Sequence, residues 1–201
     1  TNSTFKNSKA KFNGGAIHVE STKFTVTDST FEKDITVWDG GAIYAKKTKL
    51  AVTGSTFKNS KAKFNGGAIH IENTKFTITD STFEGNTADN GGAVSAREIS
   101  TSTITDSIFK GNEAAVFGGA IDIKEAKLIV ANSTFEGNTA DHGGAVFAKE
   151  TKFTVAGSTF EGNNAAHWGG SIYAWEESYV TVTGSTFERN NATYWGGAIF
   201  A

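Results

Sequence analysis

The sequence predicts an all-β protein, a three-sided parallel β-helix that winds through about eight coils of about 26 residues each. Two anchors recur with the same step. A glycine pair begins at Gly14, Gly40, Gly66, Gly91, Gly118, Gly143, Gly169 and Gly196. A phenylalanine recurs at Phe5, Phe31, Phe57, Phe83, Phe109, Phe135, Phe160 and Phe187. A fixed step of this size is typical of a solenoid, in which each repeat stacks on the one before it.

The first predicted strand of each coil follows a sharp turn and carries the phenylalanine. The turn residue is always Asn, Asp or Gly, as at Asn2, Asp28 and Gly54, and these types tolerate a left-handed backbone. Serine and phenylalanine lie two residues apart in the strand, so both point to the same side. We expect that side to be the interior, with a core row formed by Phe31, Phe57, Phe83, Phe109, Phe135 and Phe160.

Two further strands follow the glycine pair, and both are rich in the β-branched residues typical of parallel sheets. We expect their inward rows to include Ile43, Ile69 and Ile121 in one strand and Val52, Ile78 and Ile104 in the other. A mixed row lies between the inward positions of the glycine-led strand. We expect it to face solvent or a partner, and it contains His18, Tyr44, His70, Ser95, Asp122, Phe147, Tyr173 and Phe200.

The composition limits the classes of function. The net charge of the 201-residue chain is −2, with lysine and glutamate interspersed, so no basic surface for nucleic acid is expected. Cysteine is absent, which excludes thiolate metal sites and redox chemistry. No apolar run approaches the roughly 20 residues of a membrane-spanning helix. We expect one array over residues 1–201, a fragment of a longer chain with both ends uncapped.

The glycine pair followed by Ala and Ile or Val, together with an FxxN motif, resembles the polymorphic outer membrane protein repeat. FxxN occurs as Phe83 to Asn86, Phe109 to Asn112, Phe135 to Asn138, Phe160 to Asn163 and Phe187 to Asn190. The resemblance implies a right-handed parallel β-helix and a passenger region of an autotransporter or adhesin-like surface protein. Ser8, Asp34 and Ser60 replace the asparagine in the first three coils, so an inward asparagine ladder should be interrupted there.

Charged residues follow each phenylalanine and alternate in sign over the first six coils, which predicts attractive pairs between neighbouring coils. Glu136, Glu161 and Glu188 end the alternation and indicate either a cation site or drift that Arg189 relieves. The turn residues Asp141, His142 and His167 are a second candidate metal grouping, and we favour ordinary variation of turn positions. We therefore expect no metal and no cofactor.

Aromatic residues concentrate in the last two coils, and exposed aromatics mark binding surfaces for partners or sugars. The candidate partner or glycan contacts are Trp168, Tyr173, Trp175, Tyr179, Tyr194, Trp195 and Phe200. The alternative is that these side chains pack against further coils of the parent chain.

We expect an extracellular or cell-surface structural stalk and not an enzyme, because the acids are scattered over ladders and no singular site is apparent. Its expected partners are other copies, further repeats of the parent chain, or a host-cell or extracellular ligand. One alternative is a filament subunit that assembles through β-helix contacts. Another is an ice- or glycan-binding β-helix, since segments such as Thr25–Thr27 and Thr77–Thr79 place two outward threonines on one strand.

Overall fold

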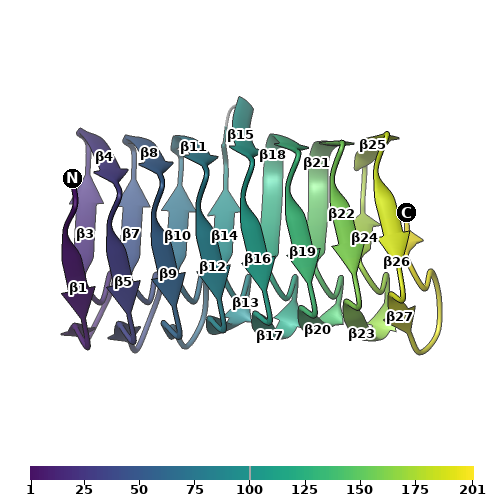
Figure 1. Ribbon diagram of the computed structural model, residues 1–201, viewed down its shortest axis with the longest axis horizontal. Helices are drawn as coiled ribbons and strands as arrows, with labels where there is room; N and C mark the ends of the chain where they lie inside the picture. The colour runs from purple at the N-terminus through teal and green to yellow at the C-terminus, as the bar shows by residue number, and fades with distance from the viewer. Residues whose placement is uncertain (100) are drawn as a thin grey trace.

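The structure, a computed structural model, describes residues 1–99 and 101–201 and forms a rod of stacked coils (Figure 1). Every strand pairing described between coils is parallel, and the strands that carry the phenylalanines stay in register, so Phe5 pairs with Phe31 and Phe31 with Phe57. The prediction of a parallel β-helix is therefore confirmed. The strands that carry the phenylalanines form one sheet: β1 (Thr4–Lys6), β5 (Thr30–Glu32), β9 (Thr56–Lys58), β12 (Thr82–Glu84), β16 (Ile108–Lys110), β19 (Thr134–Glu136), β22 (Thr159–Glu161) and β26 (Thr186–Glu188).

The glycine-led strands and the strands after them share one bent sheet. The glycine-led strands are β3 (Ile17–Glu20), β7 (Ile43–Lys46), β10 (Ile69–Glu72), β14 (Val94–Arg97), β24 (Ile172–Trp175) and β28 (Ile199–Phe200). The strands after the bend are β4 (Lys23–Thr27), β8 (Lys49–Thr53), β11 (Lys75–Thr79), β15 (Thr101–Thr105) and β25 (Tyr179–Thr183). Two long strands, β18 (Ile121–Ala131) and β21 (Val146–Ala156), run through the bend, where Glu125 and Glu150 adopt positive φ angles of 51° and 50°.

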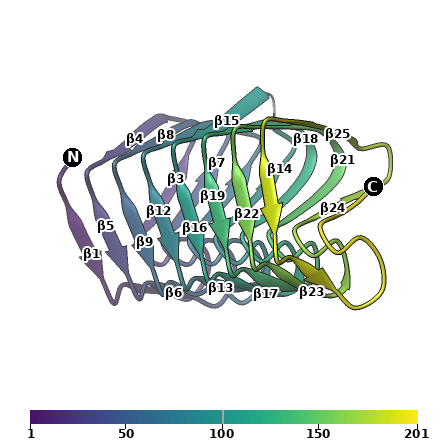
Figure 2. The ribbon, with the colours of Figure 1, turned by 45° about the vertical axis from the view of Figure 1, so that its right-hand side comes forward.

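A fourth, short strand precedes the glycine pair in most coils and was not anticipated. These basal strands lie along the bottom of Figure 1 and are β2 (Lys9–Ala10), β6 (Ile35–Thr36), β13 (Thr87–Asn90), β17 (Glu113–Phe117), β20 (Thr139–His142), β23 (Asn164–Trp168) and β27 (Asn191–Ala192). In the third coil Lys61 keeps the row continuous by bridging to Ile35 and Thr87. Figure 2 shows the basal strands following one long edge of the rod.

The interior holds the predicted aromatic and aliphatic rows. The phenylalanine rings stack face to face, with centroids 4.6–4.8 Å apart and planes within 9° of parallel. The side chains with at most 1% exposure include Phe31, Phe57, Phe83, Phe109, Phe135, Phe160, Ile43, Ile69, Ile121, Val52, Ile78 and Ile104. Ser102 is also buried, and its Oγ accepts a hydrogen bond from the backbone nitrogen of Phe76 at 3.1 Å. One continuous core therefore runs along the rod.

Two polar ladders accompany this core. Each buried serine before a phenylalanine accepts a backbone N–H from the previous coil, as Ser81 Oγ does from Ser55 at 3.2 Å, and donates within its own turn. Asn112 Nδ2 donates to Asn138 Oδ1 at 3.0 Å and to the carbonyl of Phe83 at 3.0 Å, and the same pattern runs from Asn86 to Asn190. These buried polar groups are paired, which avoids the cost of an unsatisfied donor or acceptor.

The asparagine ladder is interrupted in the first three coils, as predicted. Asp34 is fully buried, and its Oδ1 accepts the backbone N–H of Ser8 at 2.8 Å while Oδ2 has no hydrogen-bond partner. The Oγ of Ser60 is likewise without a partner. Burial raises the pKa of Asp34 above its ordinary value of 3.8.

The glycine pair performs two separate tasks. Gly118 has a positive φ of 61°, which reverses the chain between the basal and glycine-led strands. A Cβ on Gly119 would overlap the carbonyl oxygen of Gly144 in the next coil. The second glycine is therefore required by the close approach of neighbouring coils.

The mixed row of the glycine-led strands does not face solvent, and this expectation was wrong. Its members from the second to the seventh coil have at most 4% exposure: Tyr44, His70, Ser95, Asp122, Phe147 and Tyr173. The residues immediately before each glycine pair fold over them, as the ring contact of Phe117, the last residue of β17, with Phe147 at 4.3 Å illustrates. The unforeseen segment before each glycine pair therefore produces a second buried layer.

Candidate functional site

The aromatic residues of the last coils form stacked columns at the basal edge. Trp168 stacks on Trp195 with centroids 5.8 Å apart, and Tyr173 stacks on Phe200 at 5.4 Å. Trp168 also meets Tyr173 edge to face at 5.6 Å. Register explains the columns, because β23 pairs with β27 and β24 with β28. Each aromatic side chain is thus placed directly above its counterpart in the previous coil.

The predicted contact residues differ in accessibility. Tyr173 is buried, while Trp168 and Phe200 are half-buried. Trp175, Trp195 and Tyr194 are exposed by 43%, 58% and 63%. Tyr179 is exposed by 72% but begins β25 and makes no ring contact with any described residue. The structure therefore brings six of the seven residues together and leaves Tyr179 apart.

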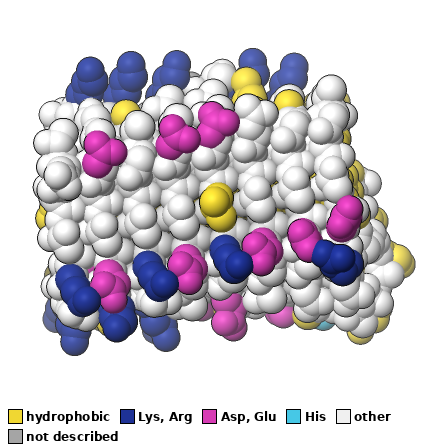
Figure 3. Space-filling view, viewed as in Figure 1, with side chains coloured by type: hydrophobic (Ala, Val, Ile, Leu, Met, Phe, Trp, Pro, Cys, Tyr) yellow, Lys and Arg dark blue, Asp and Glu magenta, His cyan; other side chains and the backbone are white. Residues whose placement is uncertain are grey.

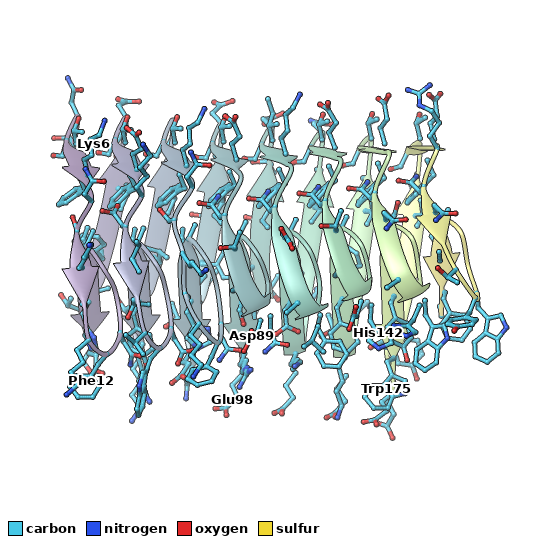
Figure 4. The ribbon with its side chains drawn as sticks, turned by 90° about the horizontal axis from the view of Figure 1, so that it is seen from below. Lys6, Phe12, Asp89, Glu98, His142 and Trp175 are labelled. Atoms are coloured by element: carbon cyan, nitrogen blue, oxygen red, sulfur yellow. The ribbon has the colours of Figure 1, made fainter. Side chains whose placement is uncertain are left out.

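The aromatic columns extend toward the N-terminus beyond the residues predicted from the sequence. His142 stacks on His167 at 4.9 Å, and Phe117 stacks on His142 at 5.5 Å. His142 also contacts Trp168 at 4.7 Å. In these coils the residue immediately before the glycine pair carries a ring, and this pattern is visible in the sequence. It predicts a column only if the segments before successive glycine pairs lie on top of one another. Figure 4 shows His142 and Trp175 along the same edge of the rod.

The two histidines do not form a metal site with Asp141. Their rings stack face to face, with planes 27° apart, and do not converge on a common point. Within residues 1–99 and 101–201, no group of three or more His, Cys, Asp or Glu side chains is placed to hold a metal ion. Burial and the neighbouring His167 lower the pKa of His142 below its ordinary value, which favours the neutral ring in this stack.

A cluster of polar groups surrounds Glu72 beside the buried mixed row. The carboxylate contacts His70 Nε2 at 3.2 Å, accepts the Tyr44 hydroxyl at 3.1 Å and pairs with Lys46 Nζ at 2.8 Å. The hydrogen bond from His70 lowers the pKa of Glu72, and desolvation together with this carboxylate raises the pKa of Tyr44 to about 12. Both oxygens of Glu72 are already engaged, so the carboxylate is not free to act as a base.

Asp122 is a second buried carboxylate of the mixed row. Its Oδ2 accepts the hydroxyl of Ser95 at 3.3 Å, and Lys124 Nζ lies 3.4 Å from Oδ1. Burial raises the pKa of Asp122 above its ordinary value. The Lys124 ammonium also lies over the Phe117 and Phe147 rings, with Nζ 5.0 Å and 5.4 Å from the centroids. This group therefore ties the turn to the glycine-led strands.

The charged row beside the phenylalanines forms the predicted pairs. Figure 3 shows the alternation of dark blue and magenta along one face. Lys6, Lys58 and Lys110 pair with Glu32, Glu84 and Glu136 at 2.9, 3.1 and 2.8 Å. Glu161 pairs with Arg189, which favours the reading that Arg189 relieves the run of glutamates. Exposed pairs of this kind contribute about 0–1 kcal/mol each, so they set register more than stability.

The outward threonines after the bend form interrupted rows. Thr25 and Thr77 both pair with Ala51, and Thr103 pairs with Ile129. The second row is continuous through Thr27, Thr53, Thr79 and Thr105 and ends at Ala131. No unbroken two-row threonine surface extends along the described coils.

Comparison with known proteins places this fold in a family. A model described as the right handed beta helix region matches residues 15–187. The chain belongs to the right-handed β-helix family. A model of the Chlamydia polymorphic membrane protein repeat matches residues 184–201 of this β-helix, the segment that holds Phe187, Asn190 and the last glycine pair. Together the two matches indicate a protein of the surface, passenger-like kind.

Comparison with curated proteins and with solved structures yields no match. Among the described residues of this β-helix, none forms a helix long and apolar enough to cross a membrane.

Proposed function

We propose that this β-helix is a stiff, non-catalytic rod that holds a contact surface away from the cell that displays it. The observation that carries the proposal is the unbroken stacking of the phenylalanine and serine rows, to which an asparagine row is added from the fourth coil onward, since such a solenoid extends without a hinge. Coils about 4.8 Å apart give eight coils a length of roughly 38 Å. The match to a surface-protein repeat supports display outside the cell.

Surface display can be tested directly by fusing the chain to an anchored carrier on a bacterial cell. We expect the displayed rod to raise attachment of the carrier cells to host-cell layers or extracellular matrix. A carrier bearing a length-matched flexible linker is the control. Attachment equal to that of the linker control would contradict a contact role and leave only a spacer role.

The absence of catalysis is part of the proposal. Glu72, Glu84 and Glu136 are each held in an ion pair with a lysine, which leaves them less available as general acids or bases. We expect no release of reducing ends or unsaturated sugars from a panel of neutral and acidic polysaccharides. Turnover that disappears when a single carboxylate is changed to its amide would overturn this part.

The adhesive contact that we favour is a neutral sugar lying against the exposed aromatics of the last coils. Trp175 and Trp195 are exposed by 43% and 58%, and sugar rings pack their C–H faces against indole. Trp175→Ala and Trp195→Ala should each reduce binding on a glycan array. Tyr179→Ala is a matched control, because Tyr179 is exposed but lies outside the stacked columns. Equal losses in all three variants would point to unfolding or non-specific binding.

The filament and ice-binding alternatives are tested separately. An open filament built from this β-helix should appear as rods longer than one copy in electron microscopy and as a ladder of masses in native mass spectrometry. Ice binding through the continuous threonine row should inhibit ice recrystallisation and be lost in Thr53→Tyr. We rank ice binding lower because the neighbouring row is interrupted.

A further inference from the structure

The outer surface of the basal strands carries charges that are sorted by coil. Call this surface, made by the outward residues of the basal strands and the turn after them, the basal face. Its first and third coils carry lysines, at Lys9, Lys11, Lys61 and Lys63. Its fourth to sixth coils carry acids instead, at Asp89, Glu113 and Asp141. Figure 4 looks onto this face, with Phe12 near one end and Asp89 near its middle.

Exposed apolar side chains on the basal face include Phe12 in the first coil and Phe64 in the third, with exposures of 57% and 40%. The second coil presents Ile35, Val37 and Trp38, with exposures of 38%, 51% and 48%. The fifth coil presents Ala115 and Val116, and Val116 is exposed by 37%. A groove of about 450 Å³ opens between these coils and is lined by residues of both, including Ile35 and Ala115, with lysine on one side and acid on the other.

The distribution of charges over the first six coils is complementary to itself under a two-fold rotation. Place a two-fold axis parallel to the strands between the third and fourth coils, so that a second copy lies face to face with its rod direction reversed. The first coil then meets the sixth, the second meets the fifth and the third meets the fourth. An isologous contact requires this kind of self-complementary surface.

Position by position along the strands, the charges match across that axis. Lys11 meets Asp141, and Lys63 meets Asp89. Glu113 faces the second coil of the other copy, and the lysines at positions 9 and 61 flank it there.

The apolar residues match in the same arrangement. Val37 meets Ala115, and Trp38 meets Val116. Within one chain these two coils are three steps apart, about 14 Å, so neither can cover the other.

We propose that two copies of this chain pair face to face and antiparallel through their basal faces. A second copy satisfies both the basic and the acidic half of the groove, whereas an anionic polymer would be repelled by the half that holds Asp89, Glu113 and Asp141. A two-fold contact closes after two copies, so the pair is not a filament. This proposal does not rest on the role proposed above.

The size of the contact predicts a reversible dimer. Six coils cover about 29 Å along the rod, and a five-residue strand covers about 17 Å across it. This small, charged patch belongs to the low end of protein interfaces, where association is weak and transient. Screening of the opposed charges by salt should weaken it further.

Sedimentation of the intact chain over a range of concentrations and salt tests the proposal. We expect a monomer–dimer equilibrium that shifts toward monomer at 1 M salt, where the Debye length falls to about 3 Å. Lys11→Glu and Asp141→Lys should each weaken the dimer about tenfold or more, and the double variant should recover most of the loss. Residues 11 and 141 are five coils apart in one chain, about 24 Å, so this recovery can only act between copies.

Lys49→Glu is the matched control, because Lys49 is exposed and lies on the strands after the bend. It should leave the dimer unchanged. A second measurement uses the absence of cysteine in the chain. Val37→Cys combined with Ala115→Cys should form disulfide-linked dimers under mild oxidation, and either change alone should form far fewer.

Several outcomes would overturn the proposal. They are a monomer at every concentration, growth beyond two copies, losses in the Lys11 and Asp141 variants that the double variant does not recover, or equal weakening by Lys49→Glu. Retention of a sulfated polysaccharide by the basal face, with no self-association, would assign the lysines to that ligand instead.

Discussion

At the scale of single residues, this protein places polar side chains in a dry interior and then pairs them from coil to coil. Asn112 Nδ2 donates to Asn138 Oδ1 and to the carbonyl of Phe83, and Asn112 Oδ1 accepts from the backbone nitrogen and Nδ2 of Asn86. Asp34 occupies the equivalent position without a proton to donate, and one of its oxygens has no partner. The first coils are therefore the place where the ladder is weakest.

Asp34→Asn should raise the free energy of unfolding by about 1–3 kcal/mol at pH 7. The new amide can donate to the carbonyl of Phe5 and to Ser60 Oγ, by analogy with the bonds of Asn86 and Asn112. Chemical denaturation at a series of pH values is the measurement.

The pH dependence of that gain has a definite sign. The folded-state pKa of Asp34 is raised, so the folded protein binds more protons than the unfolded chain between the ordinary pKa of 3.8 and the raised value. Stability of the natural chain therefore falls as pH rises through this interval. The advantage of the amide should shrink as pH falls toward 3.8, and an advantage that grows on acidification would refute the assignment.

Phe83→Ala tests the aromatic core at one residue. Phe83 is fully buried and its ring lies 4.8 Å from the rings of Phe57 and Phe109. Removing it leaves a cavity in a closely packed row, and we expect a loss of about 3–5 kcal/mol in the free energy of unfolding. A loss below about 1 kcal/mol in a denaturant melt would be incompatible with a core position.

At the scale of elements, the coil is set by backbone positions that only a few residue types tolerate. The residue before each serine has a positive φ in every coil, between 48° and 58°, and is Asn, Asp or Gly throughout, as predicted. The basal turn differs, because its second glycine is constrained by the neighbouring coil and not by its own φ. Glycine is thus used for two different steric reasons, a positive φ at one position and the close approach of a neighbouring coil at another.

Gly119→Ala and Gly137→Asn separate these requirements. A methyl group at 119 would overlap the Gly144 carbonyl and lie 2.6 Å from the amide nitrogen of Thr139, so we expect a loss of more than about 2 kcal/mol. Gly137 has a positive φ of 61° with open space around it, and Asn59 holds 54° at the equivalent position. Gly137→Asn should therefore change the free energy of unfolding by no more than about 0.5 kcal/mol. Equal melting temperatures for the two variants would disprove the close-approach argument.

At the scale of the whole molecule, stability is a sum over nearly identical coils and their interfaces. The chain tolerates steps of 25, 26 and 27 residues, because Phe135 and Phe160 stack as well as Phe83 and Phe109 do. Several of these one-residue differences are absorbed by register shifts within the basal strands, as between β13 and β17, while the phenylalanine strands stay in register. Whole coils should therefore be removable units.

Deleting residues 55–106 should leave a folded, shorter rod. The deletion removes two coils and joins Gly54 to Ser107, which restores the turn and serine that Asp106 and Ser107 form in the natural chain. Deleting residues 55–93 removes a coil and a half and should prevent folding, because it removes two phenylalanine strands, β9 and β12, but only one glycine-led strand, β10, and one strand after the bend, β11. Circular dichroism and a cooperative thermal transition distinguish the outcomes. Similar transitions for both deletions would contradict a register-based array.

The sequence alone determined the period, the parallel stacking and the inward rows. A residue type that recurs every 26 residues stacks on the equivalent residue of the previous coil when each coil has that length, as Phe57 stacks on Phe31. The alternation of side chains along each strand then decides which rows face inward. The charged pairs of Lys58 with Glu84 follow from the same register.

Only the tertiary structure decided what covers the outside of the glycine-led strands. Tyr44 and Asp122 look surface-exposed by alternation, but the turn before the glycine pair folds over them. That turn also brings His142 onto Trp168 and sorts the basal face by coil. The reason is physical: strand alternation specifies two sides of a sheet, whereas burial depends on whether a distant segment packs against the outer one.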